Sequence, residues 1–420
     1  MTVSYISIHV TFHPPHPHFQ PCRIVIAICQ FNQFKARAAS FVVATMERSV
    51  RRRLFDGYQL GGGCQPDGGC QPRPPIRIGT DCSGLDAPVA MLEEILHGRN
   101  RKVRHVFSSE NDPRTLKILL RSFDPEFHYT DVTRRADRCG QKGAIHPAAD
   151  SLPALDIYAA GFPCQPFASC GLSAGLKDAR GAVWLPLFRL IAFALPRAVI
   201  LENVVGLIRG KHRSTFEAMV TSLKSMEEYD WHHTCLNTQD FGVPQNRPRV
   251  YIVGIRRGQA AKPFAWPAAS PPTVASPQLD DFLDVAAEPL SELISSLPPA
   301  RIAKKRMKVL RAIEKVIGKG LNPLNTPAVC SAGNRACTMM LNQSPCLTRG
   351  RAKSHGHWLI HRGRQMTCQE VVRLQGLNPE RWVRPAGVSE GHFMGAVGNA
   401  MSGNVVKALL LSVLEALGEL

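Results

Sequence analysis

A cysteine that follows an apolar segment of this sequence stands where a nucleophile could be held at a fixed angle. Cys164 lies between Pro163 and Gln165, directly after the segment LDIYAAGF. Pro163 fixes its own φ and restricts its neighbour, so the position of the thiol is constrained where the segment stops. Most lone cysteines are inert, buried side chains. The interpretation of Cys164 therefore depends on the residues that accompany it.

Acidic and basic side chains flank two further apolar segments. Glu202 and Asn203 end the segment AVILEN, and Arg247 and Arg249 precede the segment VYIVGI. Because the two arginines are two positions apart, both can point to one side of an extended segment. A thiol, a carboxyl and two guanidinium groups suit an electron-poor ring such as cytosine. Thiolate addition at C6 makes C5 nucleophilic, a carboxyl at N3 lowers the barrier, and the arginines hold the carbonyl O2 and a phosphate or loop.

Apolar segments alternate with segments of helical spacing after residue 75. The expected strands are 76–78, 103–107, 155–160, 198–201 and 250–255. Apolar residues recur three or four positions apart in the intervening stretches 89–96, 183–194 and 216–223. This alternation predicts an α/β domain around a mostly parallel sheet. Such a sheet binds ligands at the carboxyl ends of its strands, where the chemical groups above are found.

The composition narrows the class of protein. A length of 420 residues suits two or three domains, and the net charge of +18 favours a polyanion, nucleic acid first and an anionic membrane surface second. No uninterrupted run of 18 apolar residues occurs, so no membrane span is predicted. Thirteen cysteines are too dilute for a disulfide scaffold and predict free thiols in a reducing compartment.

Residues 1–75 differ from the rest of the chain and predict a low-complexity leader and linker. The first 46 residues contain no Asp or Glu, as in an organelle transit peptide, a disordered tail or wrongly included upstream sequence. The near-repeat GGGCQPDGGCQP predicts a flexible linker. Its Cys64 and Cys70 lack the paired spacing of a zinc site, so no metal is predicted.

The positive charge is concentrated in the second half of the chain. Residues 258–300 are rich in Pro, Ala and Ser and predict a loop or linker. Residues 301–364 contain fourteen Lys or Arg and one acid, Glu314, which gives 14 − 1 = +13. This density predicts a nucleic-acid surface rather than a merely solvated face. Residues 367–370 then match a capping box, and an apolar final helix capped by Asn404 is expected to return to the first domain.

Six ordered motifs from residue 76 onward resemble those of the DNA cytosine-C5 methyltransferase family. PCQ (163–165) resembles the nucleophile motif, ENV (202–204) the cytosine-binding motif and QNRPR (245–249) the Q-x-R-x-R motif. GLKDARGAVW (175–184) resembles the stretch after the mobile catalytic loop, which would be residues 167–178 here. EVVRLQG (370–376) and GNAMSGNVV (398–406) resemble the last two motifs of the family. The first motif, GTDCSGLDAP, departs from the family because Asp86 and Ala87 replace later glycines and Thr80 takes the usual acidic place.

The resemblance implies a Rossmann-like, S-adenosylmethionine-dependent methyltransferase fold, with helices on both faces of the sheet and a smaller target-recognition domain. The implied divisions are a catalytic and cofactor-binding domain (76–257), a target-recognition region (258–365) and a C-terminal segment that completes the catalytic domain (366–420). The implied activity is methyl transfer from S-adenosyl-L-methionine to C5 of cytosine in double-stranded DNA, through a covalent Cys–C6 adduct and a flipped base.

The same resemblance implies a role for each matching residue. The implied catalytic residues are Cys164, Glu202, Arg247, Arg249, Pro163, Gln165 and Asn203. The implied cofactor contacts are Ser83, Gly84, Glu110, Asn111, Asp131, Val132, Val183 and Asn404. Within this set, Glu110 would bind the ribose hydroxyls, and Asp131 and Val132 would lie beside the adenine. The implied DNA contacts are Gln245, Thr348, Arg349 and Arg351, with Thr348 of CLTRG on a phosphate.

Two alternatives stay open at this point. A tRNA cytosine-C5 methyltransferase is disfavoured because the chain has no C-F-T tripeptide, and a catalytically inactive DNA-binding homologue is opposed by the intact Cys164, Glu202, Arg247 and Arg249. No membrane and no obligate protein partner are predicted. The expected location is the nucleus if the source is eukaryotic, with an organelle as the alternative, and the cytoplasm if it is bacterial.

Overall fold

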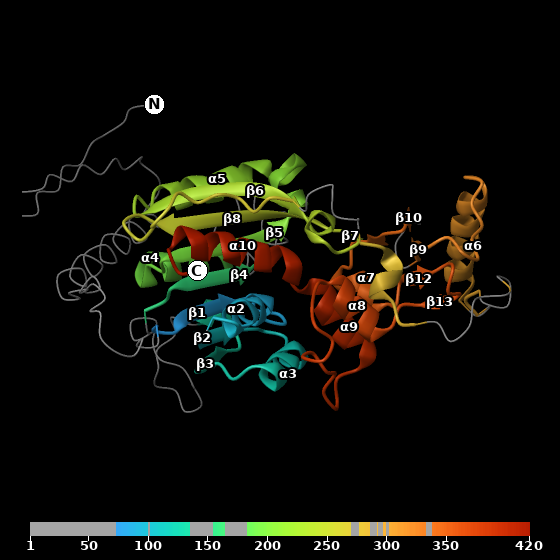
Figure 1. Ribbon diagram of the computed structural model, residues 1–420, viewed down its shortest axis with the longest axis horizontal. Helices are drawn as coiled ribbons and strands as arrows, with labels where there is room; N and C mark the ends of the chain where they lie inside the picture. The colour runs from blue at the N-terminus through green and yellow to red at the C-terminus, as the bar shows by residue number, and fades with distance from the viewer. Residues whose placement is uncertain are drawn as a thin grey trace, which may run out of the picture. The chain divides into compact units, whose positions relative to one another are not determined.

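A seven-stranded sheet in the order β3-β2-β1-β4-β5-β8-β6 carries the larger part of the fold (Figure 1). Its strands, in chain order, are β1 (Ile76–Asp81), β2 (Val103–Ser109), β3 (Phe127–Tyr129), β4 (Ile157–Gly161), β5 (Ala198–Val204), β6 (Tyr229–Asn237) and β8 (Pro248–Arg256). Neighbouring strands are parallel, except that β8 runs antiparallel to both β5 and β6. The mostly parallel sheet is confirmed, and each of the five expected strands overlaps an observed one.

This computed structural model describes residues 73–99, 101–134, 154–163, 183–269, 277–285, 292, 297–299, 302–332 and 338–420. All of them belong to one unit of the chain, Gly69–Leu420. Several predicted features lie outside the described residues: residues 1–72 of the predicted leader, with Cys64 and Cys70, the nucleophile candidate Cys164 with Gln165, and the predicted loop 167–178.

Helices cover both faces of the large sheet, because its central strands are apolar on both sides. In β5, Ile200 packs into one core and Leu201 into the other. The first face is covered by α2 (Ala87–His97), α3 (Pro113–Ser122) and α10 (Gly403–Ala416), and the second by α4 (Trp184–Ala194) and α5 (Arg213–Lys224). Burial on both faces explains the nearly continuous apolar runs from which the strands were predicted. The helices expected near 89–96, 183–194 and 216–223 are confirmed as α2, α4 and α5.

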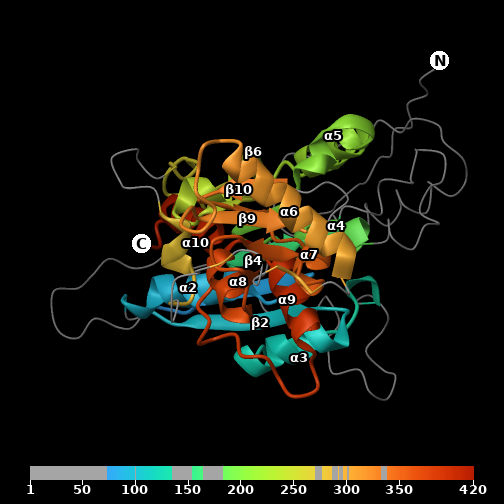
Figure 2. The same cartoon turned by 90° about the vertical axis from the view of Figure 1, so that its right-hand side faces the viewer.

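A second, antiparallel sheet forms in the basic half of the chain, in the order β10-β9-β12-β13. Figure 1 labels its four strands, and Figure 2 shows β9 and β10 from the side. Its strands are β9 (Ala328–Ser331), β10 (Thr338–Leu341), β12 (His357–Leu359) and β13 (Arg364–Gln365). Helix α6 (Ala303–Ile317) packs Val309 and Val316 into a small core with Cys330 of β9 and Trp358 of β12. This small core lies within the region 258–365, for which a smaller target-recognition domain is predicted; the boundaries of that domain stay a prediction.

The first part of the expected loop 258–300 is irregular but fixed in place. Residues 258–269 form no helix or strand. The N–H groups of Ala261 and Lys262 donate to the carbonyl of Ala416 at 2.7 and 3.1 Å, and Phe264 and Trp266 pack against the core. The composition of this segment therefore identified its irregular backbone but not its attachment to α10.

Two helices, α8 (Cys368–Leu374) and α9 (Glu390–Asn399), follow β13 and lead to α10, and α7 (Arg349–Lys353), which precedes β12, packs on α9. The capping box of Thr367 and Glu370 is confirmed at the start of α8. Helix α10 packs on α2, as expected, and Lys407 pairs with Glu94 at 2.6 Å. The prediction that Asn404 caps this helix is wrong, because α10 begins at Gly403 and the Asn404 amide instead donates to backbone carbonyls of residues 238 and 241.

One helical stretch among the described residues, Glu390–Ala416, is long and apolar enough to cross a membrane by length and composition alone. It comprises α9 and α10, and 67% of its most apolar window is buried inside the protein. Packing in the core therefore accounts for its apolar composition.

Glu419, just after α10, ties the end of this helix to the sheet, and its removal tests that link. Its carboxylate pairs with Arg101, at 2.5 Å, and with Arg197. Burial opposes ionisation, but the two arginines outweigh it and lower the pKa of Glu419. We expect Glu419→Gln to reduce the free energy of unfolding by about 1–2 kcal/mol at pH 7. Because only the ionised carboxylate is stabilised by folding, this difference shrinks as the pH falls below about 4.

Urea denaturation at several pH values measures this difference. The control is Glu217→Gln, which breaks an exposed pair with Arg213 on α5 and is expected to change stability by less than about 0.5 kcal/mol. Equal losses in the two variants at pH 7 would contradict the prediction.

Candidate active site

The carboxyl ends of β1, β2, β4 and β5 meet at one edge of the large sheet. The chain order changes direction between β1 and β4, which is the point where open α/β sheets bind ligands. Because β8 is antiparallel, its beginning lies at the same edge, with Arg249 opposite Val204 and Val250 opposite Asn203. The segments that follow four strands and the segment that precedes β8 are therefore gathered at one place.

Glu110 and Gly84 lie together at the ends of β2 and β1. The N–H of Gly84 donates to Glu110 Oε2 at 3.0 Å, and the N–H of Asp112 donates to Oε1 at 2.9 Å. Burial raises the pKa of Glu110, in spite of these two hydrogen bonds. Each carboxylate oxygen keeps a further lone pair, so Glu110 has the chemistry to accept two vicinal hydroxyl groups.

The remaining predicted cofactor contacts come from several elements. After β3, Asp131 accepts hydrogen bonds from the N–H and hydroxyl of Thr133 at 2.8 and 2.7 Å, and Val132 is buried. Val183 is half-buried at the start of α4, and Asn111 is exposed. Asn404 Oδ1 is buried and has no hydrogen-bond partner among the described residues.

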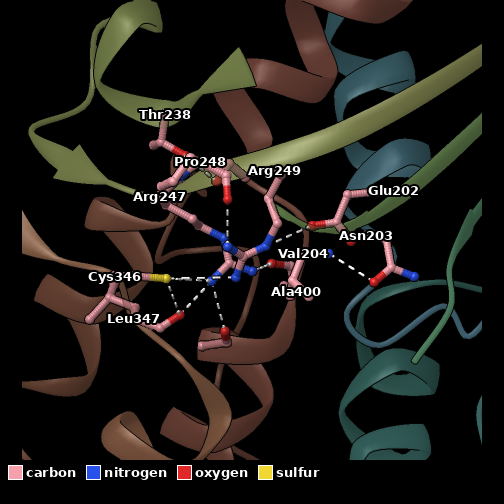
Figure 3. A network of polar contacts seen from close by, with 12 residues as sticks. Glu202, Asn203, Val204, Thr238, Arg247, Pro248, Arg249, Cys346, Leu347 and Ala400 are labelled. Carbon is pink, nitrogen blue, oxygen red and sulfur yellow. Dashed lines mark hydrogen bonds and ion pairs between the residues drawn. The ribbon is translucent and has the colours of Figure 1, made fainter. Parts of the chain in front are cut away.

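Glu202 and Arg249 form an ion pair at the same edge, with 3.1 Å between Oε1 and Nε and 11% of each side chain exposed (Figure 3). Burial alone would lower the pKa of Arg249, but Glu202 and Cys346 raise it. The neighbouring Asn203 donates from its amide to the carbonyl of Phe162 at 2.9 Å. This bond fixes the backbone just before Pro163, the last described residue ahead of Cys164.

Arg247 has a different position from the one predicted. Its side chain is buried and donates to the carbonyls of Leu347, Gly398, at 3.1 Å, and Ala400, at 2.7 Å (Figure 3). Burial and the neighbouring Arg249 lower the pKa of Arg247. The two arginines were expected to hold the carbonyl O2 and a phosphate or the loop; the described bonds of Arg247 are instead internal, because three backbone carbonyls occupy its guanidinium.

Cys346 belongs to this cluster and was missed as a site residue. Its Sγ lies 3.7 Å from Arg247 Nη1 and 3.6 Å from Arg249 Nη2 (Figure 3). Burial opposes ionisation of the thiol, but the two arginines outweigh it and lower the pKa of Cys346. The sequence flagged its segment, CLTRG, but gave no sign that a thiol nearly 100 residues away meets both arginines.

The predicted DNA contacts divide into internal and surface residues. Gln245 is fully buried, and its amide donates to Leu374 O at 2.5 Å and accepts from Leu347 N–H at 3.0 Å. A DNA contact by Gln245 is therefore not retained, because its side chain joins two internal segments. Thr348 caps α7 by accepting from the N–H of Arg351 at 3.4 Å, and Arg349 pairs with Asp112 at 2.7 Å.

Pairing between two very short strands brings these segments to the site. β7 (Gln245–Asn246) and β11 (Ser344–Pro345) are parallel, with residue 245 opposite residue 344. Both strands continue directly into site residues, Arg247 on one side and Cys346 on the other. The pairing explains how residues 245–249 and 346–349 meet.

A family model described as C-5 cytosine-specific DNA methylase matches residues 89–415. The chain belongs to this family. The family membership predicted from six motifs is thus confirmed. The matched residues include the ends of β2, β4 and β5 and the start of β8, where the predicted site residues lie.

Several curated relatives of this methylase are bacterial enzymes. The type II methyltransferase M.NgoBI of Neisseria gonorrhoeae is 28% identical over 308 residues, which cover 72% of this chain and 84% of that protein. M.NlaIV of Neisseria lactamica is 28% identical over 239 residues, which cover 54% and 52% of the two chains. M.HgiCII of Herpetosiphon aurantiacus is 38% identical over 199 residues, which cover 47% and 41%. The chain thus spans about half the length of several relatives that it matches.

Solved structures support the fold of the methylase. The S. pombe Dnmt2 methyltransferase matches with a TM-score of 0.52 at 16% identity, over 81% of this chain and 98% of that one. The Entamoeba histolytica methyltransferase EhMeth matches with a TM-score of 0.54 at 14% identity and the same coverage. The Rossmann-like methyltransferase fold is therefore confirmed.

The two arginines of the QNRPR segment are expected to respond differently to the same substitution. Arg247→Lys should lower the free energy of unfolding by about 2 kcal/mol, because one ammonium cannot replace two guanidinium nitrogens that bind three buried carbonyls. Arg249→Lys keeps a positive charge beside Glu202 and should lower it by less than about 1 kcal/mol. Urea denaturation of both variants measures the difference, and a larger loss in Arg249→Lys would show that the two roles are misassigned.

Proposed function

We propose that this methylase transfers a methyl group from S-adenosyl-L-methionine to C5 of cytosine in double-stranded DNA. The observation that carries the proposal is the Glu202–Arg249 pair. Glu202 lies opposite Gly161 of the neighbouring strand β4, and Cys164 follows Gly161 by three residues. A carboxyl and a guanidinium at this edge suit the N3 and O2 atoms of a cytosine ring. Family membership supports the same activity, as does the fact that the relatives are named type II methyltransferases.

The proposed reaction begins when the Cys164 thiolate adds to C6 of the target cytosine. Glu202, carrying a proton, donates a hydrogen bond to the acceptor N3 and Arg249 holds O2, so that the electron pair of the C5–C6 double bond moves to C5. C5 then takes the methyl group, with S-adenosylhomocysteine as the leaving group. C5 loses its proton to a base, and the thiolate is expelled as the C5–C6 double bond re-forms. Asn203 supports this chemistry through its bond to Phe162, which holds the backbone ahead of the nucleophile.

S-adenosyl-L-methionine supplies the electrophilic methyl group in this proposal. The residues at the ends of β1 to β3 fit such a ligand, because Glu110 keeps lone pairs for ribose hydroxyls and stands beside the backbone turn at Ser83 and Gly84. Asp131 and Val132 would flank the adenine. Asn404, whose Oδ1 has no partner among the described residues, offers a further acceptor.

Double-stranded DNA is the proposed substrate, and its target base must leave the stack, because C5 and C6 are inaccessible within a duplex.

Several arginines of the basic region already pair with acids of the protein: Arg349, Arg362 and Arg364 pair with Asp112, Asp280 and Glu370. On α6, by contrast, no carboxylate among the described residues forms a salt bridge with Lys304, Arg311 or Lys315. We therefore assign phosphate binding first to α6.

Neither alternative is favoured over DNA methylation. The matched family is one of DNA methylases, which argues against tRNA as the substrate and against an inactive homologue. The type II methyltransferases that the chain resembles are bacterial, which favours the cytoplasm of a bacterium, and a nuclear location has no support.

A covalent trap tests the proposed nucleophile. A duplex that contains 5-fluorocytosine should form an adduct stable to denaturation when methyl donor is present, because fluorine at C5 cannot be removed as a proton. Cys164→Ser should abolish the adduct and methyl transfer, a loss of at least about 10³-fold. Cys235→Ser, at an exposed cysteine on β6, is the matched control and should keep both.

Peptide mapping of the adduct and labelled methyl transfer to DNA or tRNA read the outcome. An adduct on another side chain would refute the role of Cys164. Label in tRNA alone would replace the DNA substrate, and label in neither would favour the inactive homologue.

The salt dependence of DNA binding tests the assignment of α6. Replacing Lys304, Arg311 and Lys315 together by Gln should reduce the slope of log K against log salt by about three units if each binds one phosphate. The control is Lys262→Gln, at an exposed lysine that pairs with Glu415 of α10. A slope that is unchanged in the triple variant would assign α6 to a solvated face.

A further inference from the structure

Asp86 is a buried acid at the proposed cofactor edge that the reaction above does not use. It lies at φ 57° and ψ 42°, in the left-handed region, which Asp and Asn tolerate better than other side chains with a Cβ. It occupies the N-cap position of α2, yet its side chain forms no capping hydrogen bond. Because capping is the usual task of an aspartate at this position, its carboxylate serves another purpose.

The carboxylate of Asp86 joins the end of β1 to β2. It accepts hydrogen bonds from the hydroxyls of Thr80, at 3.1 Å, and Ser108, and Oδ2 lies 3.3 Å from His105 Nε2. Asp86 has no exposed surface. A buried carboxylate requires such partners to remain stable inside a protein, so this cluster is a fixed part of the fold.

A chain of hydroxyl groups leads from Asp86 to the turn at Ser83. Because the Thr80 hydroxyl donates its proton to Asp86, its oxygen accepts the hydroxyl of Ser83 at 2.7 Å. The Ser83 oxygen accepts the N–H of Ser109 at 2.9 Å. The Ser83 N–H donates in turn to the Ser109 carbonyl at 2.8 Å, which holds the turn against the end of β2.

The residue after Ser83 is Gly84, whose N–H binds Glu110. We infer that Asp86 is a positioning residue of the cofactor site: through Thr80 and Ser83 it holds the turn that places Gly84 and Glu110 for S-adenosylmethionine. This inference rests on the proposed function, since it takes this edge as the site of that ligand. Asp86 itself does not contact the ligand, because it has no exposed surface.

Binding of S-adenosylhomocysteine to the full-length chain, measured by calorimetry, tests the inference without catalysis. Asp86→Gly fits the backbone conformation but removes the carboxylate, and it should weaken binding about tenfold, the loss expected for one charged hydrogen bond. Asp86→Asn fits the same conformation and keeps an oxygen acceptor, and it should bind within about threefold of the natural protein. Affinity for duplex DNA should be the same in all three proteins.

The control for general loss of stability is Asp156→Asn. Asp156 is also a buried acid, paired with Arg77 at 2.9 Å and near Arg197, but it lies just before β4, at the opposite end of the strand from the site. This variant should lower the melting temperature without changing the affinity for S-adenosylhomocysteine.

Two results would overturn the inference alone: natural affinity in Asp86→Gly, or an equal loss of affinity in Asp156→Asn. If Asp86→Gly does not fold, Thr80→Val replaces it, because it removes only the hydroxyl between the carboxylate and the turn. Thr80→Val should weaken binding by at least about threefold, and unchanged affinity would again overturn the inference. A natural protein that binds no S-adenosylhomocysteine would instead refute the proposed function together with the inference.

Discussion

The arrangement of the candidate active site depends on the hydrogen bonds of the buried Arg247 guanidinium. It joins three backbone segments that are distant in the sequence, the start of β8, the segment after β11 and the turn between α9 and α10. Each of these segments carries a predicted site residue a few positions away: Arg249, Thr348 and Asn404. A charge buried in this way is stable only while all its partners are present. The contact therefore makes the formation of the edge cooperative.

Much of the fold follows from the sequence, because its central strands are buried on both faces. Continuous apolar runs identified β1, β2, β4, β5 and β8, and helical spacing identified α2, α4 and α5. Strand β6 was missed, because it lies at the edge of the sheet and alternates exposed with half-buried residues around His232, His233 and Cys235. The start of α10 was misplaced, because Asn404 has the type of a capping residue but uses its amide to bind the backbone after β6.

Only those residues of the candidate site that lie at strand ends could be predicted from the sequence. Glu202 and Arg249 follow from chemistry and the alternation of β-strands, and the structure pairs them. The sequence could not show that Arg247 and Arg249 have different roles, because the carbonyl partners of Arg247 lie 100 to 153 residues further along the chain. The same holds for Cys346 and for the buried cluster of Asp86, whose members are neighbours only through strand pairing.

The charged residues of the chain fall into two sets, one inside the site and one on the surface. Inside, acids and bases neutralise one another in pairs such as Glu202 with Arg249, so that charged groups are held in place where water is scarce. Outside, Lys304, Arg311 and Lys315 of α6 form no salt bridge with a carboxylate among the described residues, whereas Arg349, Arg362 and Arg364 are paired. Paired and unpaired charges thus lie in different segments of the chain.

The anchoring of residues 261 and 262 to Ala416 has a consequence for how this protein can change. The chain leaves the large sheet at a point fixed to α10 and returns through the β7–β11 pair and Gln245, which are equally fixed. The stretch between these two attachments supplies β9 and β10 to the second sheet, and its Leu279, Leu283 and Val329 also pack into the core beside the large sheet. Helix α6 packs instead into the separate small core, so a change on its exposed face leaves both attachments in place.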